Sequence, residues 1–80
     1  MNDQTQSQTF GERAVGLSFN PSGEDSVHLL KSAAASFIDL CDEARNLSKD
    51  PEVKRMYSIA ITEAQTAQMW GVKAATWKGE

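Results

Sequence analysis

Hydrophobic residues recur with helical spacing over two long stretches of the chain. In the first stretch, a seam expected to face a partner helix consists of Val27, Leu30, Ala34, Phe37, Cys41 and Ala44. In the second, the repeating positions are Val53, Met56, Tyr57, Ala60, Ile61, Ala64, Ala67 and Ala74. Such spacing is typical of amphipathic α-helices. The pattern therefore predicts an all-α fold built on two long helices.

Capping residues place the start of the first helix. The run Asn20-Pro21-Ser22-Gly23 predicts a turn, because proline fixes φ and asparagine and serine favour turns. Ser22 and Asp25 approximate a capping box. We therefore expect the first helix to begin near Ser22 to Glu24.

The second helix has a clearer start. Asp50 is a favourable N-cap, and Pro51 is preferred at the first helical position. We expect this helix to end near Lys78-Gly79, where a cation and a glycine follow the last periodic residue. The connection between the helices is short, so they must form an antiparallel hairpin.

A second apolar stripe on the first helix indicates self-association. Leu29, Ala33, Leu40 and Leu47 form this stripe, which the small polar Ser36 weakens. One helix with two stripes needs two partners, and the hairpin supplies only one. A chain of 80 residues with one cysteine has no intrachain disulfide to compensate for its small core. We therefore expect a compact homo-oligomer.

The N-terminal part divides into a tail and an arm. Residues 1–9 are polar and lack apolar periodicity, which favours a disordered tail. Residues 10–19 carry Phe10, Val15, Leu17 and Phe19 between glycines, and we expect them to pack as an arm on the hairpin or on a neighbouring subunit. Residues 10–80 are thus predicted to form one domain of arm and hairpin.

Charge and hydropathy exclude several classes of function. The net charge of −3 argues against a DNA or RNA polymer as partner, because such proteins carry a basic face. No apolar run is long enough to predict a membrane span. The only cysteine, Cys41, lies on the apolar seam as a core residue, and the only histidine, His28, lies at its boundary. No catalytic set, metal site or cofactor is predicted, which favours binding over reaction.

Two groups of residues are candidates for binding an anionic ligand. Trp70, Lys73 and Trp77 share one helical face, where indoles can stack on nucleobases and lysine can pair with phosphate. The alternative is that the tryptophans fill an intersubunit core. Lys54 and Arg55 lie in the first turn of the second helix, where cations oppose the helix dipole. They either bind an anion there or are exposed charges offset by neighbouring carboxylates.

Several segments resemble one known family. They are Phe19-Asn20-Pro21-Ser22, Val27, Lys31, Phe37-Ile38-Asp39, Arg55-Met56, Ile59-Ala60, Glu63-Ala64 and Met69-Trp70-Gly71-Val72-Lys73-Ala74-Ala75-Thr76. Together they resemble the helical-hairpin domain shared by phage anti-CBASS and anti-Thoeris sponge proteins. In size the chain is most similar to anti-CBASS proteins of the second type.

This resemblance implies a function without catalysis. Such proteins act in the cytoplasm of the infected bacterium and sequester cyclic oligonucleotide second messengers of host CBASS immunity without cleaving them. The implied ligands are cGAMP-type cyclic dinucleotides and cyclic triadenylate-type trinucleotides, held in separate pockets of a homohexamer. The alternative is a structural module that oligomerises or binds a host protein.

The resemblance also implies ligand-binding residues. Lys31 matches a lysine that contacts the dinucleotide, whereas Arg55 and Lys73 match basic positions suited to phosphate. Where some relatives have an aromatic residue that stacks on a base, this chain has Gly16. Stacking then moves to Phe10 or Phe19, or the chain lacks this contact. The matching segments add two further candidates, Asn20 and Trp70.

Overall fold

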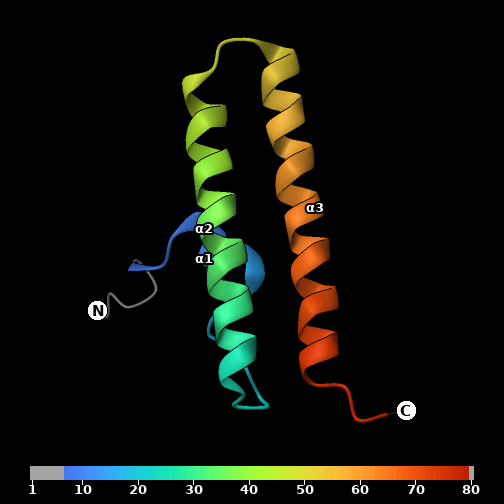
Figure 1. Ribbon diagram of the computed structural model, residues 1–80. Coiled ribbons are helices and arrows are strands. Elements are labelled where there is room, and N and C mark those ends of the chain that lie inside the picture. Colours follow the sequence, from blue (N-terminus) through green and yellow to red (C-terminus); the bar gives the residue numbers. More distant parts are fainter. Residues whose placement is uncertain (1–6, 80) are drawn as a thin grey trace.

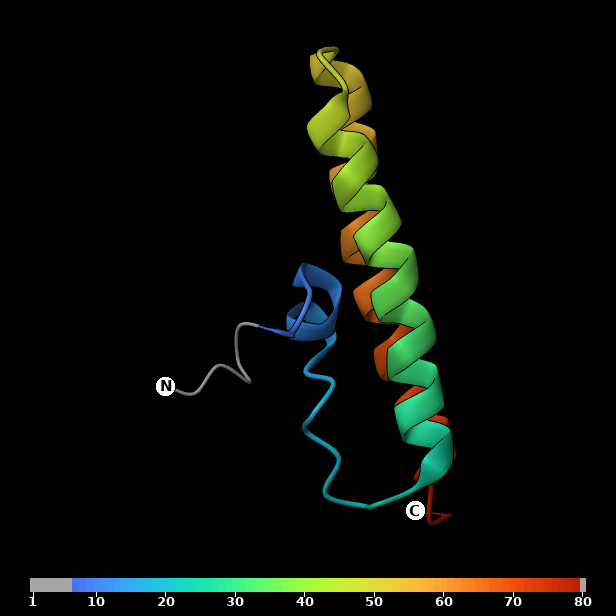
Figure 2. The same ribbon diagram turned by 90° about the vertical axis from the view of Figure 1, so that its left-hand side faces the viewer.

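The computed structural model describes residues 7–79, which form three helices and no strand. They are α1 (Phe10–Val15), α2 (Asp25–Leu47) and α3 (Pro51–Ala75). The two long helices run antiparallel, side by side, and are joined by a short turn at one end (Figure 1). α1 lies against one side of this hairpin, and a linker runs from it to the start of α2 (Figure 2). The predicted all-α hairpin with an N-terminal arm is confirmed.

Local capping explains where α1 and α3 begin. The carboxylate of Asp50 accepts a hydrogen bond from the Glu52 backbone N–H at 2.9 Å, and Pro51 occupies the first turn, as predicted. Thr9 and Glu12 form a capping box at the start of α1. Residues 1–6 of the predicted tail (residues 1–9) lie outside the described residues. The division into tail and domain stays a prediction.

α2 begins next to the predicted Ser22 to Glu24, with Glu24 as its N-cap, whereas the predicted capping box of α2 and the predicted end of α3 are wrong. Ser22 does not cap α2; its hydroxyl donates to Asn20 Oδ1 and accepts from the Glu24 N–H, so it shapes the preceding turn. α3 ends at Ala75, before the predicted Lys78-Gly79. Thr76 leaves the helical region at φ −107° and ψ 11°, and its hydroxyl donates back to the Val72 carbonyl at 2.9 Å.

The core lies where all three helices meet. Its buried residues are Val15, Ala35, Ile38, Cys41 and Ile61. Ile38 is fully buried, although the predicted seam omitted it, whereas the seam residues Leu30 and Phe37 are 38% and 50% exposed. The predicted seam is therefore only partly correct. The physical reason is the arm: α1 packs on α2 and turns the buried stripe toward Ala35 and Ile38.

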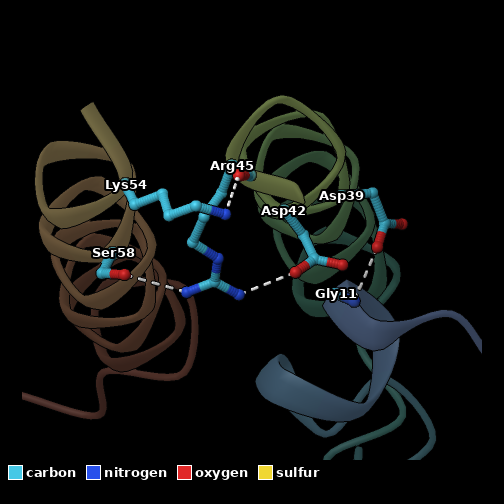
Figure 3. A network of polar contacts seen from close by, with 6 residues as sticks. All are labelled: Gly11, Asp39, Asp42, Arg45, Lys54 and Ser58. Carbon is cyan, nitrogen blue, oxygen red and sulfur yellow. Dashed lines mark hydrogen bonds and ion pairs between the residues drawn. The ribbon is translucent and has the colours of Figure 1, made fainter. Parts of the chain in front are cut away.

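The arm is held by close approach and by polar contacts. A Cβ atom on Gly11 would lie 2.9 Å from the carbonyl carbon of Ala35, so α1 and α2 touch backbone to backbone at this glycine. The Gly11 N–H donates to Asp39 Oδ1 at 2.7 Å (Figure 3). On the α3 side, Gln65 Nε2 donates to the Ala14 carbonyl at 3.2 Å.

Arg45 connects the two long helices near the hairpin turn. Its guanidinium donates to Ser58 Oγ on α3 at 3.0 Å and forms an ion pair with Asp42 at 2.7 Å (Figure 3). Lys54 Nζ donates at 3.0 Å to the Arg45 carbonyl in the last turn of α2, which also accepts from the Ser48 N–H at 3.3 Å. Lys54 thus has a structural task that explains a cation at the start of α3.

The side of the hairpin opposite α1 carries no element of the described chain (Figure 2). A shallow apolar groove runs along this side, lined by Leu30, Ala33, Ala34, Phe37, Ala64, Ala67 and Gln68. The second stripe is exposed as well: Leu29, Leu40 and Leu47 are each at least 66% accessible. Within residues 7–79, no helix combines the length and hydropathy needed to cross a membrane.

Candidate functional site

A cavity of about 280 Å³ lies at the end of the hairpin away from the α2–α3 turn. Figure 2 shows that the linker after α1, the start of α2 and the end of α3 meet at this end. The lining residues come from all three segments: Phe19, Asn20, Pro21, Ser22, Val27, Lys31, Val72 and Thr76. Three sequence-predicted site residues, Phe19, Asn20 and Lys31, are thus brought together by the fold.

Lys31 supplies the fixed charge of this cavity. The residue is only 6% exposed, and Nζ donates to the carbonyls of Gly16, at 2.9 Å, and Phe19. No carboxylate among residues 7–79 forms an ion pair with it. A buried ammonium without a counter-ion carries a desolvation cost that an anion would offset. Because an ammonium has three N–H donors, one remains for a ligand.

Gly16 ends α1 and has no side chain that could stack on a base. It caps α1 with φ +63° and ψ 54°, a left-handed conformation that glycine adopts without strain. This geometry turns its carbonyl toward Lys31. The nearest side-chain atom to a Cβ built at Gly16 is Phe19 Cβ, at 3.9 Å. Gly16 therefore lies next to a phenylalanine that lines the cavity.

Asn20 has a structural role in the linker. Its Nδ2 donates to the Glu24 carbonyl at 3.0 Å, and its Oδ1 accepts from Ser22 Oγ at 2.8 Å. The side-chain amide is therefore engaged at both ends, and it shapes the turn that lines the cavity. The prediction of Asn20 as a ligand contact stays untested.

Sequence reasoning missed five of the cavity-lining residues, which are Pro21, Ser22, Val27, Val72 and Thr76. Val72 lies on α3 and Thr76 caps its end four residues later, and both line the cavity together with Val27 and Lys31 of α2. Their spacing within the segment around Lys73 was the signal that would have found them.

Trp70 and Lys73 lie outside this cavity, on the outer face of α3. With Ala74 and Trp77 they line a separate shallow hollow. Trp70 is 67% exposed, and Lys73 Nζ lies 5.6 Å from the centroid of the Trp77 ring, within cation–π range. Both tryptophans are thus free of the intrachain core.

Phe10 and Arg55 lie in other parts of the molecule. Phe10 is on α1, with the Arg45 guanidinium 5.8 Å from its ring centroid. Arg55 is in the first turns of α3, roughly 25 Å along the helix from Val72 at 1.5 Å per residue. The single chain therefore does not bring either residue to the Lys31 cavity.

Arg55 is paired within its own helix. Its guanidinium donates to the Glu52 carboxylate at 2.6 Å, and this hydrogen bond lowers the pKa of Glu52 and raises the pKa of Arg55. Both side chains are exposed, which matches the expectation that charges at this position are offset by neighbouring carboxylates.

The described residues hold no cluster of three or more histidine, cysteine, aspartate or glutamate side chains placed to bind a metal ion. Cys41 is buried in the core, as predicted, and His28 is exposed. What the cavity can do chemically is bind: it offers one ammonium, an exposed aromatic ring and apolar walls.

Comparison with known families agrees with the hairpin fold. The model of the Acb2/Tad1 hairpin domain matches residues 12–76, which span the end of α1, the linker and both long helices. Neither the comparison with curated proteins nor the comparison with solved structures produced a match. The family match covers most of the chain, including every residue that lines the Lys31 cavity. The protein therefore belongs to the Acb2/Tad1 hairpin-domain family.

Proposed function

We propose that this protein is a phage sponge for cyclic oligonucleotide second messengers of host immunity. It binds these messengers in the cytoplasm of the infected bacterium and holds them intact, so that the host effector is never activated. One observation carries the proposal: Lys31, within the matched domain, is buried in the wall of a cavity and has no ion-pair partner among residues 7–79. Such a cavity suits a ligand that joins phosphates to flat bases.

The size of the cavity favours a ligand shared between two chains. Sites that enclose a drug-sized ligand measure roughly 300–1,000 Å³, and the cavity of one chain has about 280 Å³. A cyclic dinucleotide carries two phosphates and two bases in pseudo-twofold symmetry. Two copies of the cavity, facing each other across a twofold axis, match that symmetry. The expected stoichiometry is one dinucleotide for two chains.

Self-association supplies the second copy. Twelve large hydrophobic side chains of the described residues are exposed, whereas six hydrophobic residues are buried. Leu30 and Phe37, two of these exposed side chains, line the groove opposite α1, and an exposed apolar groove is typical of an interface. We propose a homo-oligomer that covers the groove opposite α1 and the stripe of Leu29, Leu40 and Leu47. A hexamer is the state that the family resemblance implies.

A second ligand class is assigned to the outer face of α3. Cyclic triadenylate-type trinucleotides need several stacking surfaces and positive charges. Trp70 and Lys73, exposed and adjacent, offer one of each in every chain. Arg55 lies far from both sites of its own chain, so it can contribute only to a site of a neighbouring chain in the oligomer.

The mechanism requires tight binding and no bond cleavage. A sponge lowers the free concentration of the messenger, so its only output is affinity. Nanomolar binding corresponds to about −12 kcal/mol. Charge-assisted hydrogen bonds and base stacking, repeated by symmetry in two chains, are the contacts available to supply it.

Isothermal titration calorimetry tests the proposal. Cyclic GMP–AMP and cyclic triadenylate are titrated separately into the wild type, Lys31→Met and the control Lys49→Met. Lys49 is an exposed lysine at the far end of the hairpin. We expect dinucleotide binding to weaken at least tenfold in Lys31→Met and to stay unchanged in the control. The bound ligand should be recovered intact after heat denaturation.

Two outcomes contradict the proposal. The first is absence of binding by any cyclic nucleotide at micromolar concentration, and the second is recovery of a linear product. Co-purification of a host protein without a nucleotide would instead support the alternative, a helical-hairpin interaction module.

A further inference from the structure

We propose that Phe19 is the base-stacking residue of the Lys31 cavity. The inference rests on the proposed function and names the side chain that would hold the ligand's base. It assigns the stacking contact to the linker between α1 and α2, three residues beyond the glycine that caps α1.

The first argument is the free surface of the ring. Phe19 is 71% exposed although it lines the cavity. Lys31 Nζ lies 5.4 Å from the ring centroid, so one side of the ring is associated with a cation. The rest of the ring is open. A phenylalanine with a cation on one side and solvent on the other has room for a base.

The second argument is that the backbone carrying this ring is held in place. Lys31 Nζ donates to the backbone carbonyl of Phe19 itself and to that of Gly16. The Phe19 N–H donates to the Gly16 carbonyl at 2.9 Å. The first part of the linker, from Gly16 to Phe19, is thereby held around the ammonium. A stacking platform fixed in advance loses less conformational entropy on binding.

The third argument is the juxtaposition of charge and ring. Lys31 and Phe19 line the same cavity. In a nucleotide, the phosphate and the base are joined through one sugar, so a cation and an aromatic ring must lie this close to bind both. Phe10, the other exposed phenylalanine beside a cation, faces Arg45 and does not line this cavity.

Four variants test the assignment by titration with cyclic GMP–AMP. Phe19→Ala removes the ring, Phe19→Leu keeps an apolar side chain without a ring, and Phe19→Trp enlarges it. Phe10→Ala is the matched control. Loss of one base–aromatic stack weakens binding about 5- to 150-fold, equivalent to about 1–3 kcal/mol. We expect this loss in Phe19→Ala and Phe19→Leu, and wild-type affinity in Phe19→Trp and Phe10→Ala.

A spectroscopic readout separates stacking from mere apolar contact. Base protons that stack on a ring shift upfield in the NMR spectrum of the bound ligand. We expect this shift with the wild type and with Phe10→Ala, and its loss with Phe19→Leu. Thermal unfolding of each variant in the absence of ligand shows whether its fold is intact.

The outcomes distinguish this inference from the proposed function. If the wild type binds no cyclic nucleotide, both fail. If the wild type binds and Phe19→Ala binds equally well, the stacking role of Phe19 is overturned while the sponge function stands. Full rescue by Phe19→Leu, with the upfield shift retained, also overturns it.

Discussion

Gly11→Ala replaces one hydrogen by a methyl group on α1, at a residue that does not line the Lys31 cavity. We nevertheless expect it to abolish ligand binding. The new Cβ would lie 2.9 Å from the carbonyl carbon of Ala35 and closer still to its oxygen. Both are backbone atoms of a helix that cannot yield. α1 must therefore leave α2, and the linker with Gly16 and Phe19, which lines the cavity, moves with it.

The cost follows from the contacts that α1 makes. Undocking removes the hydrogen bond from the Gly11 N–H to the Asp39 carboxylate, 2.7 Å long, and hydrogen bonds to charged groups contribute about 1.5–3 kcal/mol. It also exposes Val15, which is 6% accessible, at about 1.5–3 kcal/mol. The free energy of unfolding should fall by about 3–6 kcal/mol. For a chain of this size, such a loss lowers Tm by at least about 10 °C.

Gly71→Ala is the matched control. Gly71 is inside α3, and a Cβ there would meet only the flexible side chain of Leu30, at 3.4 Å. Because alanine is favoured over glycine in a helix by about 1 kcal/mol, this variant should be as stable as the wild type or more so.

Thermal unfolding followed by circular dichroism measures both glycine variants, and calorimetry with cyclic GMP–AMP measures their ligand affinity. Hydrogen exchange of residues 10–20 reports the arm directly, and we expect protection to be lost in Gly11→Ala alone. If Gly11→Ala melts like Gly71→Ala and binds ligand like the wild type, the arm does not hold the cavity, and the reasoning is refuted.

Three further predictions concern the core, the open groove and the exposed ion pair. Ile38→Ala should lower the free energy of unfolding by about 2–5 kcal/mol in urea titrations, because the side chain is fully buried; a loss below about 1 kcal/mol would contradict the assigned core. Phe37→Glu should dissociate the oligomer in light scattering while helical dichroism is retained, and an unchanged mass would exclude the groove as an interface. Arg55 holds the pKa of Glu52 below its ordinary value, so the pair's small contribution to stability is present above the unfolded-state pKa and fades as pH falls through the folded-state pKa. Glu52→Gln should therefore melt slightly below the wild type at neutral pH and together with it in strong acid; an equal difference at both pH values would show that the pair is not the cause.

The hairpin was predictable because its signals are local. Asp50 and Pro51 mark the start of α3 without reference to any other part of the chain. The apolar residues of both long helices follow helical spacing, which a reader of the sequence can recognise directly. The rotation of the buried stripe toward Ile38 was not predictable in this way. It depends on α1, whose docking rests on Gly11 meeting Ala35 across the fold, a contact that no local spacing reveals.

The candidate site was predictable in part for the same reason. The resemblance to a family indicated Lys31, and the fold adds that its ammonium is buried against the Gly16 and Phe19 carbonyls. Only the structure separates Phe19 from Phe10 as a stacking candidate, because the choice depends on which ring lines the cavity. For Lys54, the unfavourable position of a cation at the start of a helix did not indicate a ligand site. Its ammonium instead donates to the Arg45 carbonyl at the end of α2.

Native mass spectrometry of the purified protein with cyclic GMP–AMP tests the central claim most directly, since it reads chain number and ligand number in one spectrum. The account predicts an oligomer that binds one intact dinucleotide for every two chains, and loss of the bound ligand in Lys31→Met with the oligomer preserved. A ligand-free oligomer at micromolar cyclic nucleotide, or a Lys31→Met oligomer that binds as many ligands as the wild type, would contradict it.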